Sequence, residues 1–488
     1  MKTQTKRLMR VIQYLSILVL AGGIQYSVAG AHLSARVPVA PTTPVTVEDI
    51  LQLPQQTPPT AVAVRQEDIP QPSPTPAQAT PAPDTSSPQY HRALRLQKRI
   101  ANRFGFLLGT SEIVHGLEQQ DALMNRSITV SLQSSDHRSI PSWSVSAQTS
   151  PQWIQIDVSP LHLSYTLSPA LIAEDLRSNP PVGITYPVNA TLLSIEKDDD
   201  QVLRAHTEGI AKTGDDFDPS RVALTLVTAL AGTQTGITID IHPLAGRIAN
   251  ATGEDLGNLE LLSTGHSDFE GSGVGRKSNV RKGINKYLHN TFVPAQEDFG
   301  INSVLIHVPT SEWELALGIF NGGDLRMIPG GGLCQVATTL YRAALNAGFP
   351  ITKRANHSLF VHYYEKYGVG IDATIFPGRQ DLAFRNDTGH PLLIQAYTEG
   401  DEAFVNVYGT PDGRVAKMKG PYFSANALTS SLLDGKKIHS NEIAWVQEIH
   451  FADGSVQANP VISRYKSIPR SVVKEYLHAA ADAEPVVE

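Results

Sequence analysis

The feature that most constrains this fold is a run of three glycines just before the chain's only cysteine, Gly330-Gly331-Gly332-Leu333-Cys334. From Cys334 to Asn346, apolar residues recur at the spacing of an amphipathic helix. Gly348 is placed to end that helix in a left-handed conformation, and Pro350 blocks its continuation. The sulfur is therefore predicted to lie at a helix N-terminus, where unpaired N–H groups favour a thiolate. The alternative is that Cys334 is a small buried apolar residue, as many free cysteines are.

Five strand-like segments follow the predicted helix and indicate an antiparallel sheet beside it. They span residues 359–364, 370–375, 382–385, 392–397 and 403–408. His357 precedes the first segment and Asp372 lies within the second. Because neighbouring strands lie about 4.8 Å apart, the two side chains are predicted to meet if these strands pair. A thiol, an imidazole base and a carboxylate that orients the imidazole form the arrangement used in thiol catalysis. His362 is the alternative base.

Residues 277–409 resemble the VanW family, which is named for an accessory protein of vancomycin-resistance clusters. The matching segments are Asn279-Val280, Ile284-Asn285, Pro294 to Phe299, Gly330 to Tyr341, Arg354 to Ser358, Gly370 to Thr374 and Phe384 to Asn386. The chain departs from the family where Pro-Gly-Glu usually precedes Phe-Ser-Phe-Asn, because it reads Pro-Ala-Gln-Glu-Asp-Phe-Gly-Ile-Asn over residues 294–302. The resemblance implies a protein of the bacterial cell envelope that works near peptidoglycan. The resemblance implies no established reaction.

The order of these residues along the chain also resembles, more remotely, the transglutaminase-like and papain-like thiol folds. In that interpretation Cys334 is the nucleophile, His357 is the base and Asp372 orients the base. Gln335, or the backbone N–H groups that begin the helix, would stabilise the oxyanion of the reaction. The residues predicted to bind substrate lie beside the thiol and the imidazole: Gly331, Gly332, Gln335, Asn356 and Ser358. No cofactor and no metal site is predicted.

The N-terminus has the composition of an export signal. Four basic residues precede a mostly apolar stretch from Val11 to Ile24, and Ala29-Gly30-Ala31 offers small residues for cleavage. Residues 1–31 are therefore predicted to be a signal peptide or, alternatively, an uncleaved membrane anchor. Residues 32–90 contain thirteen of the chain's 33 prolines among Thr, Gln and Ala, which predicts a disordered linker.

Residues 91–265 are long enough for an α+β domain with its own core. A basic helix is predicted at 91–103, and alternating apolar residues predict strands at 128–132, 142–146, 153–158 and 237–241. Two helices are predicted to begin at Ser168-Pro169 and Asp218-Pro219, because a capping residue precedes proline in both. In position and arrangement the region resembles the YoaR-like peptidoglycan-binding domain. Trp143 and Trp153 are interpreted either as sugar-stacking residues or as core residues.

The remaining boundaries follow from the same patterns. The VanW-like domain is predicted to span residues 266–412, and residues 413–488 form a C-terminal extension. Within the extension, segments 443–451 and 456–463 predict a hairpin and segment 471–481 predicts a helix. The predicted fold class is a secreted, two-domain α+β protein whose cysteine-bearing helix is followed by an antiparallel sheet.

Composition excludes several classes of protein. A formal net charge of −7 supplies no basic stripe for nucleic acid, and the sequence has neither a phosphate-binding loop nor a paired-cysteine zinc spacing. Two functional hypotheses remain. In the first, an envelope protein binds peptidoglycan or acts near it, with the Gly-Gly-Gly-Leu-Cys-Gln segment as its functional centre. In the alternative, a thiol acyltransferase or amidase acts on the peptide stems of peptidoglycan. The predicted partner is peptidoglycan or its peptide stems, and the N-terminus is a candidate membrane anchor.

Overall fold

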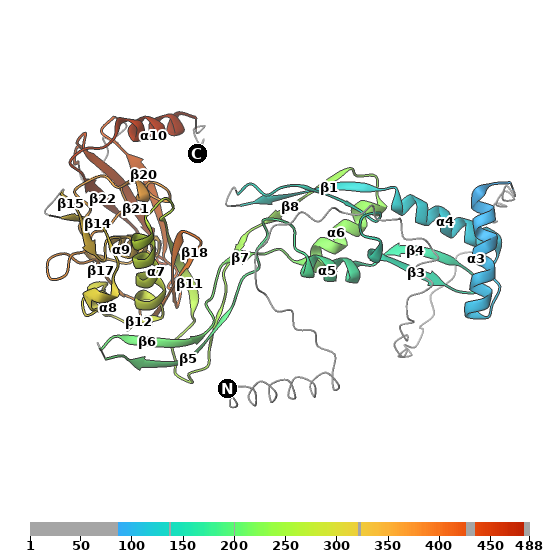
Figure 1. Cartoon of the computed structure of the whole chain (residues 1–488), viewed down its shortest axis with the longest axis horizontal. Coiled ribbons are helices and arrows are strands. Elements are labelled where there is room, and N and C mark those ends of the chain that lie inside the picture. The colour runs from blue at the N-terminus through green and yellow to red at the C-terminus, as the bar shows by residue number, and fades with distance from the viewer. Residues whose placement is uncertain (1–85, 136–137, 200, 321–323, 426–434, 483–488) are drawn as a thin grey trace, which may run out of the picture. The chain divides into compact units, whose positions relative to one another are not determined.

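The computed structural model describes residues 86–135, 138–199, 201–320, 324–425 and 435–482 (Figure 1). The predicted signal or anchor, and the predicted linker up to residue 85, lie outside these described residues. The chain divides into two compact units, residues 1–105 and 106–488. Among the described residues, none of the helices combines the length and the apolar character that a membrane crossing requires.

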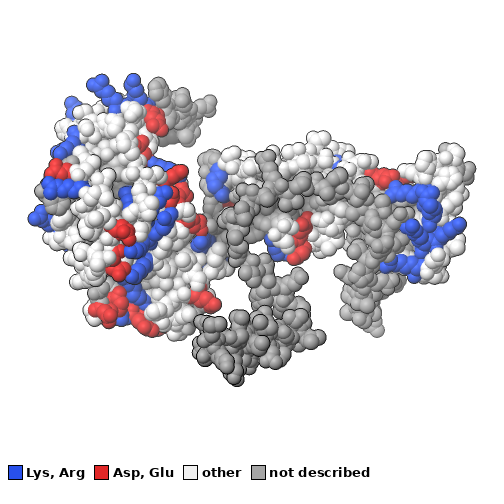
Figure 2. All heavy atoms as spheres, viewed as in Figure 1, with Lys and Arg blue, Asp and Glu red and all other residues white. Residues whose placement is uncertain are grey.

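The described part of the first unit contains helix α3 (Pro88–Phe104), which confirms the helix predicted there. The helix begins earlier than predicted because Ser87 caps it. The Ser87 hydroxyl accepts a hydrogen bond from the backbone N–H of Tyr90 at 3.1 Å, and Pro88 fits the first turn. Gly105 ends the helix in the left-handed region, with φ of 76°. Basic side chains gather over α3 (Figure 2).

The second unit begins with helices and small sheets. Its first elements are α4 (Thr110–Met124), β1 (Ser127–Ser134), β2 (Trp143–Ser146), η1 (Pro151–Trp153), β3 (Ile154–Val158), β4 (Leu163–Leu167), α5 (Pro169–Ser178), α6 (Pro219–Ala231) and β8 (Gly236–Ile241). Strand β1 pairs antiparallel with β2 and parallel with β8, whereas β3 and β4 form a hairpin. The predicted strands and both predicted helix starts are confirmed: Ser168 and Asp218 each accept a backbone N–H through their side chains.

The two tryptophans of this segment lie in different surroundings. Trp153 is only 4% exposed, and its Nε1 donates a hydrogen bond to Asp175 Oδ2 at 2.7 Å. Trp143 is half-buried on β2, opposite Val130 of β1. The core interpretation therefore holds for Trp153, because a ring with both its faces enclosed has none to offer a sugar.

The largest sheet has seven strands in the order β10-β5-β6-β12-β18-β19-β11. Its strands are β5 (Ala190–Lys197), β6 (Leu203–Glu208), β10 (Ile248–Asn250), β11 (Glu260–Asp268), β12 (Thr291–Val293), β18 (Leu392–Glu399) and β19 (Glu402–Gly409). The boundary predicted between residues 265 and 266 falls inside β11, which pairs with β19. Strand β6 also pairs with β12 across that boundary. The sheet therefore takes strands from both of the predicted domains.

Helix α9 (Cys334–Asn346) packs on this sheet and confirms the predicted helix at both ends. Gly348 follows it in the predicted left-handed conformation, with φ of 74°. Gly265 on β11 permits close packing, because a Cβ at that position would lie 2.0 Å from the carbonyl oxygen of Thr339. Beside α9, helix α7 (Val274–Lys282) continues into the π-helical turn η2 (Gly283–Leu288). The main core lies among these elements and includes Val280, Ile284, Val336, Leu340, Val405 and Val407.

Smaller elements complete this part of the fold. They are β7 (Gly214–Asp215), β9 (Pro243–Leu244), β13 (Asp298–Gly300), α8 (Asn302–Leu305), η3 (Thr310–Glu312), β14 (Leu315–Phe320), β15 (Asp324–Pro329), β16 (Ile351–Lys353) and β17 (Ala383–Arg385). Strands β13, β17 and β16 form a sheet in that order, and β14 pairs with β15 as a hairpin that leads into the glycine run. One face of this hairpin exposes Leu317 and Met327, which are opposite each other in the register.

Two of the predicted strands are absent. Residues 359–364 contain only a short 3-10 turn, η4 (His362–Tyr364), and residues 370–375 are irregular. The buried guanidinium of Arg342 on α9 organises this region, because it donates hydrogen bonds to the carbonyl oxygens of five residues. These are His266, Tyr364, Lys366, Gly368 and Ile371. Carbonyls that are bound to a side chain need no neighbouring strand. The strands predicted near 382–385, 392–397 and 403–408 are confirmed as β17, β18 and β19.

The C-terminal extension folds as a three-stranded sheet and a helix. Strands β20 (Val415–Tyr422), β21 (Glu442–His450) and β22 (Val456–Arg464) pair antiparallel in that order, and α10 (Arg470–Asp482) follows. The predicted hairpin and closing helix are therefore confirmed. Trp445 Nε1 donates to the carbonyl of Val369 at 2.8 Å, and Gln447 Nε2 donates to the carbonyl of Leu345 at 2.7 Å. The extension is thus bonded to α9 and to the irregular segment before residue 370.

Candidate functional site

Cys334 is the first residue of α9 and is half-buried. The turn before it depends on glycine. Gly332 has φ of 105°, and a Cβ on Gly331 would lie 2.4 Å from the carbonyl oxygen of Ala316. The side-chain amide of Asn279 on α7 donates to the Gly331 carbonyl at 3.0 Å and so holds the turn. The sequence therefore places the sulfur at a helix N-terminus, as predicted.

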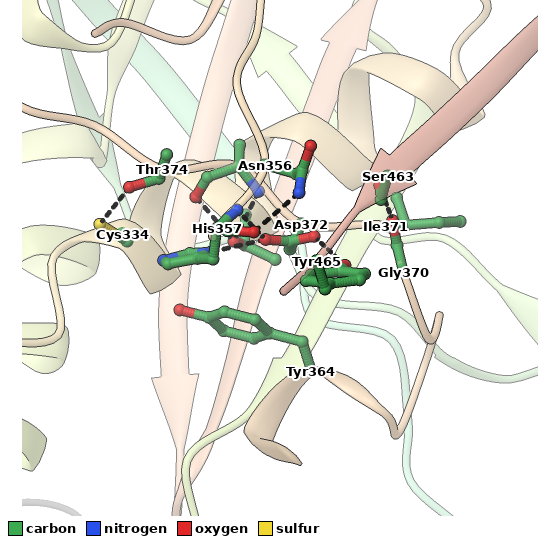
Figure 3. Close-up of polar contacts among 12 residues, drawn as sticks. Cys334, Asn356, His357, Tyr364, Gly370, Ile371, Asp372, Thr374, Ser463 and Tyr465 are labelled. Carbon is green, nitrogen blue, oxygen red and sulfur yellow. Dashed lines mark hydrogen bonds and ion pairs between the residues drawn. The ribbon is translucent and has the colours of Figure 1, made fainter. Parts of the chain in front are cut away.

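Besides the helix, the sulfur has polar neighbours from three residues, one of which, Ile375, also places its carbonyl oxygen 3.7 Å away. Its Sγ lies 3.4 Å from the hydroxyl of Thr374, and the backbone N–H of Ile375 donates to it at 3.5 Å. The third neighbour is the imidazole of His357, whose ring lies beside the sulfur (Figure 3). Thr374 and Ile375 both belong to the irregular segment that follows Asp372, so the segment beside the thiol also supplies the carboxylate.

His357 and Asp372 meet in the structure. Asp372 Oδ2 lies 2.5 Å from His357 Nδ1 and also accepts the backbone N–H of His357 at 2.8 Å. Both residues are buried, at 5% and 1% exposed. Nδ1 is hydrogen-bonded to the carboxylate, and the other ring nitrogen, Nε2, lies on the side of the sulfur (Figure 3). The predicted contact is correct, but it is made by irregular segments and not by paired strands.

The carboxylate of Asp372 is held on its other oxygen as well. The hydroxyl of Tyr465 donates to Oδ1 at 2.5 Å, and a guanidinium nitrogen of Arg354 lies 3.7 Å from the same oxygen. The ring of Tyr364 packs beside the imidazole of His357, with centroids 5.4 Å apart. The imidazole is therefore enclosed by a fixed carboxylate, an aromatic ring and the thiol.

The three ionisable groups change one another's proton affinity. Burial raises the pKa of the Cys334 thiol, but the interaction with His357, together with Thr374 and Ile375, outweighs burial and lowers the pKa to about 7. Burial lowers the pKa of His357, but Asp372 and Cys334 outweigh it and raise the pKa to about 10. Burial also raises the pKa of Asp372, and its contacts with His357, Arg354 and Tyr465 bring the net pKa below its usual range. Near neutral pH, these shifts favour a thiolate beside an imidazolium.

Gln335 does not offer its side chain to the thiol. It is fully buried, and its Nε2 donates to Ser267 Oγ at 3.0 Å and to the carbonyl of Asp268 at 2.9 Å. Both amide hydrogens are therefore used to fasten α9 to β11. The backbone N–H of Gln335 donates to the Gly332 carbonyl at 2.9 Å. The side chain thus has a structural contact in place of the oxyanion role proposed from the sequence.

Asn356 and Ser358 flank His357 but contact the C-terminal extension. The amide nitrogen of Asn356 donates to the carbonyl of Arg464 at 2.7 Å, and the Ser358 carbonyl accepts the backbone N–H of Lys466 at 2.8 Å. The alternative base, His362, is exposed and pairs with Glu365. His357, and not His362, is therefore the imidazole beside the thiol.

Three contacts of the site were missed by sequence reasoning. Arg354 and Thr374 lie inside the segments that match the VanW family, so the motif itself carried a signal for them. Tyr465 lies 93 residues after Asp372, and no local pattern marks it. Within the described residues, no group of three or more His, Cys, Asp or Glu side chains is placed to hold a metal ion.

The fold and the site together define an α+β protein with a cysteine, a histidine and an aspartate brought to one place, at the N-terminus of a helix that packs on an antiparallel part of a sheet. Comparison with known proteins gives this arrangement a family. Residues 275–408 match the family described as VanW like protein, so the chain carries a VanW-like domain and the resemblance predicted from the sequence is confirmed.

One curated relative supports this result. The chain is 31% identical over 142 residues to a Bacillus subtilis (strain 168) protein described as "Uncharacterized protein YoaR". The match covers 29% of this chain and 46% of that protein, so the chain spans about half the length of the relative it matches. No solved structure matches the chain.

Proposed function

We propose that this protein is a thiol-dependent amidase or acyltransferase of the bacterial cell envelope that acts on the peptide stems of peptidoglycan. One observation carries the proposal. The imidazole of His357 lies between the buried carboxylate of Asp372 and the half-buried thiol of Cys334, whose pKa is lowered to about 7. Perturbed ionisable groups of this kind concentrate at catalytic sites. As a residue, Cys334 keeps part of its surface exposed.

The reaction follows from the three residues. The thiolate Sγ of Cys334 attacks a peptide carbonyl carbon, and the electrons of the C=O bond move to the oxygen. When the tetrahedral intermediate collapses, the C–N bond breaks and the amine leaves with a proton from His357, which produces a thioester on Cys334. Water, or a second amine, then gives a proton to His357 and attacks the thioester, which releases the thiolate. Water as the acceptor makes the protein an amidase, and an amine makes it an acyltransferase.

The cellular setting rests on other grounds. VanW-like domains suggest a cell-envelope protein, and the sequence predicts an export signal or anchor at residues 1–31. Peptidoglycan peptide stems supply the amide bonds on which a thiolate can act. The order of cysteine, histidine and aspartate along the chain resembles that of the transglutaminase-like and papain-like thiol folds. These arguments support the substrate class, and the site geometry supports the reaction.

The proposal is tested by incubating the full chain with purified, enzymatically solubilised muropeptides and following the products by mass spectrometry. We expect an amide bond to be cleaved into two fragments that together weigh one water more than the substrate, or the acyl part to be transferred to an added amine, and we expect Cys334→Ala to abolish both. His362→Ala is the matched control, because it removes an exposed imidazole without touching the thiol. If the wild-type chain leaves muropeptides intact and Cys334 alkylates as slowly at pH 7 as an ordinary thiol, the proposal is wrong.

A second candidate is an envelope protein that binds peptidoglycan without catalysis. It is favoured by the contacts of the sulfur, since Cys334 Sγ lies 3.4 Å from the hydroxyl of Thr374 and accepts the Ile375 N–H, as a purely structural thiol can. In that case the wild-type chain and Cys334→Ala bind isolated cell walls equally well in a pull-down, and neither changes muropeptide mass.

A further inference from the structure

The structure assigns a role in this site to the C-terminal extension: we propose that Tyr465 is a positioning residue, which holds the carboxylate of Asp372 against His357. The inference rests on the proposed function, because it assumes that the pair of His357 and Cys334 is the reactive pair. It adds that the VanW-like domain, residues 275–408, does not contain the whole site. The end of β22 and the residues after it supply the missing part.

The extension forms hydrogen bonds with both segments that carry site residues, the one before Asp372 and the one around His357. On the Asp372 side, the hydroxyl of Ser463 donates to the Gly370 carbonyl at 2.5 Å. On the His357 side, Asn356 donates to the Arg464 carbonyl at 2.7 Å, and Lys466 donates its backbone N–H to the segment after His357. The two segments are also bonded to each other, through the Thr374 N–H and the Ala355 carbonyl at 2.8 Å, and the extension adds contacts to both of them.

Because Arg354 lies close to the carboxylate of Asp372, the hydroxyl of Tyr465 is needed to keep that carboxylate directed at His357. The Arg354 Nε donates to the carbonyl of Asp372 at 2.9 Å, its Nη1 to the carbonyl of Ile462 at 3.1 Å and its Nη2 to Ser463 Oγ at 2.5 Å. Nη2 also lies 3.7 Å from Asp372 Oδ1, so its second N–H is the one nearest this oxygen. The hydroxyl of Tyr465 occupies Oδ1 at 2.5 Å. Without that hydroxyl, a buried carboxylate oxygen has lost its hydrogen-bond donor, and rotation toward Arg354 is the way to recover one. This rotation takes Oδ2 away from His357 and pairs the carboxylate with a different cation.

Contacts other than the one with Asp372 fix the position of Tyr465. The residue is 4% exposed, and its ring packs edge-on against Phe360, with centroids 5.5 Å apart. Its backbone N–H donates to the Asn441 carbonyl at 2.9 Å, and Asn441 Nδ2 donates back to the Tyr465 carbonyl at 2.7 Å. Because the ring of Tyr465 is already fixed, its hydroxyl can orient the Asp372 carboxylate without any rearrangement of Tyr465.

The test is the pH dependence of iodoacetamide alkylation of Cys334 in the full chain, which needs no substrate. For Tyr465→Phe we expect the apparent pKa of the thiol to rise by about one from its wild-type value near 7, so that alkylation at pH 7 slows about fivefold. Tyr476→Phe is the matched control: it removes a hydroxyl from the same extension, bonded at 3.3 Å to the carbonyl of Glu365 and not to Asp372. Ser463→Ala is a second variant, and it should shift the pKa in the same direction by less.

The outcomes separate the two proposals. A wild-type midpoint near 7 that rises in Tyr465→Phe but not in Tyr476→Phe supports the role of Tyr465. A wild-type midpoint near 7 that is unchanged or lower in Tyr465→Phe overturns that role and leaves the proposed function standing. A wild-type midpoint at the ordinary value of a thiol overturns both. Melting temperatures of the variants, measured alongside, distinguish a shifted pKa from a chain that has failed to fold.

Discussion

At the scale of single residues, the site depends on whether one proton lies on the Cys334 sulfur or on the His357 imidazole. Asp372 binds His357 through the ring nitrogen and the backbone N–H together, so the imidazole can neither turn nor change its tautomer. This arrangement makes an imidazolium favourable in a buried position and thereby makes a thiolate favourable beside it. The three residues were predictable from the sequence, because the glycine run and the order of cysteine, histidine and aspartate mark them. Tyr465 was not, because its contact with Asp372 joins residues that are far apart in the chain.

The first prediction concerns the imidazole. In His357→Gln the thiol loses the neighbour that lowers its pKa, whereas the burial that raises the pKa remains. The apparent pKa of Cys334 should return from about 7 to the ordinary thiol value or above, and alkylation at pH 7 should slow about fifteenfold. The rate measured from pH 5 to 10 gives the midpoint directly. The variant's curve should lie on the alkaline side of the wild-type curve.

His362→Gln serves as the control, because its imidazole is exposed and bonded to Glu365. Its alkylation curve should coincide with that of the wild-type chain. A His357→Gln curve that also coincides with the wild-type curve would show that the thiol is indifferent to the imidazole.

At the scale of elements, the sequence predicts well those helices and strands whose signals lie close together in the chain. Helix α9 begins and ends where predicted because its start, its apolar stripe and its glycine stop all lie within a few turns of one another. The two strands predicted at 359–364 and 370–375 were wrong for a reason that no local pattern carries. Arg342, on a different element, binds one carbonyl in each of these segments, at Tyr364 and Ile371, and also the Gly368 carbonyl between them. Gly368 and Gly370 also have positive φ, 139° and 79°, which an extended strand does not have.

The second prediction concerns the contact between α9 and β11. In Gly265→Ala the added methyl group meets the carbonyl oxygen of Thr339, a backbone atom that cannot move without the helix. We expect the free energy of unfolding to fall by about 2 kcal/mol, measured by urea denaturation, because the helix must shift away from the sheet. Gly389→Ala is the control, since a Cβ there meets nothing within 4 Å. Equal stability of both variants would show that α9 is not held as closely as the structure indicates.

At the scale of the whole second unit, the site is assembled from parts of the chain that lie far apart in sequence. The thiol is on α9, the imidazole and carboxylate are on irregular segments after β16, and the hydroxyl that holds the carboxylate follows β22. Sequence patterns predicted these elements separately but not how they come together, because sheet pairing and side-chain contacts between distant segments leave no periodic signal. The seven-stranded sheet shows the same limit, since its strands cross the boundary predicted at residue 265.

The last prediction follows from this assembly and compares two truncations of the full chain. A chain that ends at residue 412 loses Tyr465 and the hydrogen bonds of Trp445 and Gln447 to the rest of the fold. It should melt at a lower temperature, and its thiol should alkylate with the pKa of an ordinary cysteine. A chain that ends at Pro469 loses α10, with its buried Val472, and the residues after it, and keeps Tyr465. It should lose stability, because Val472 packs in the same cluster as Tyr465, but retain a thiol midpoint near 7, because the Tyr465 hydroxyl and the backbone bonds to Asn441 remain. If the chain ending at residue 412 keeps that midpoint, the extension only stabilises the fold and the carboxylate is held by the VanW-like domain alone.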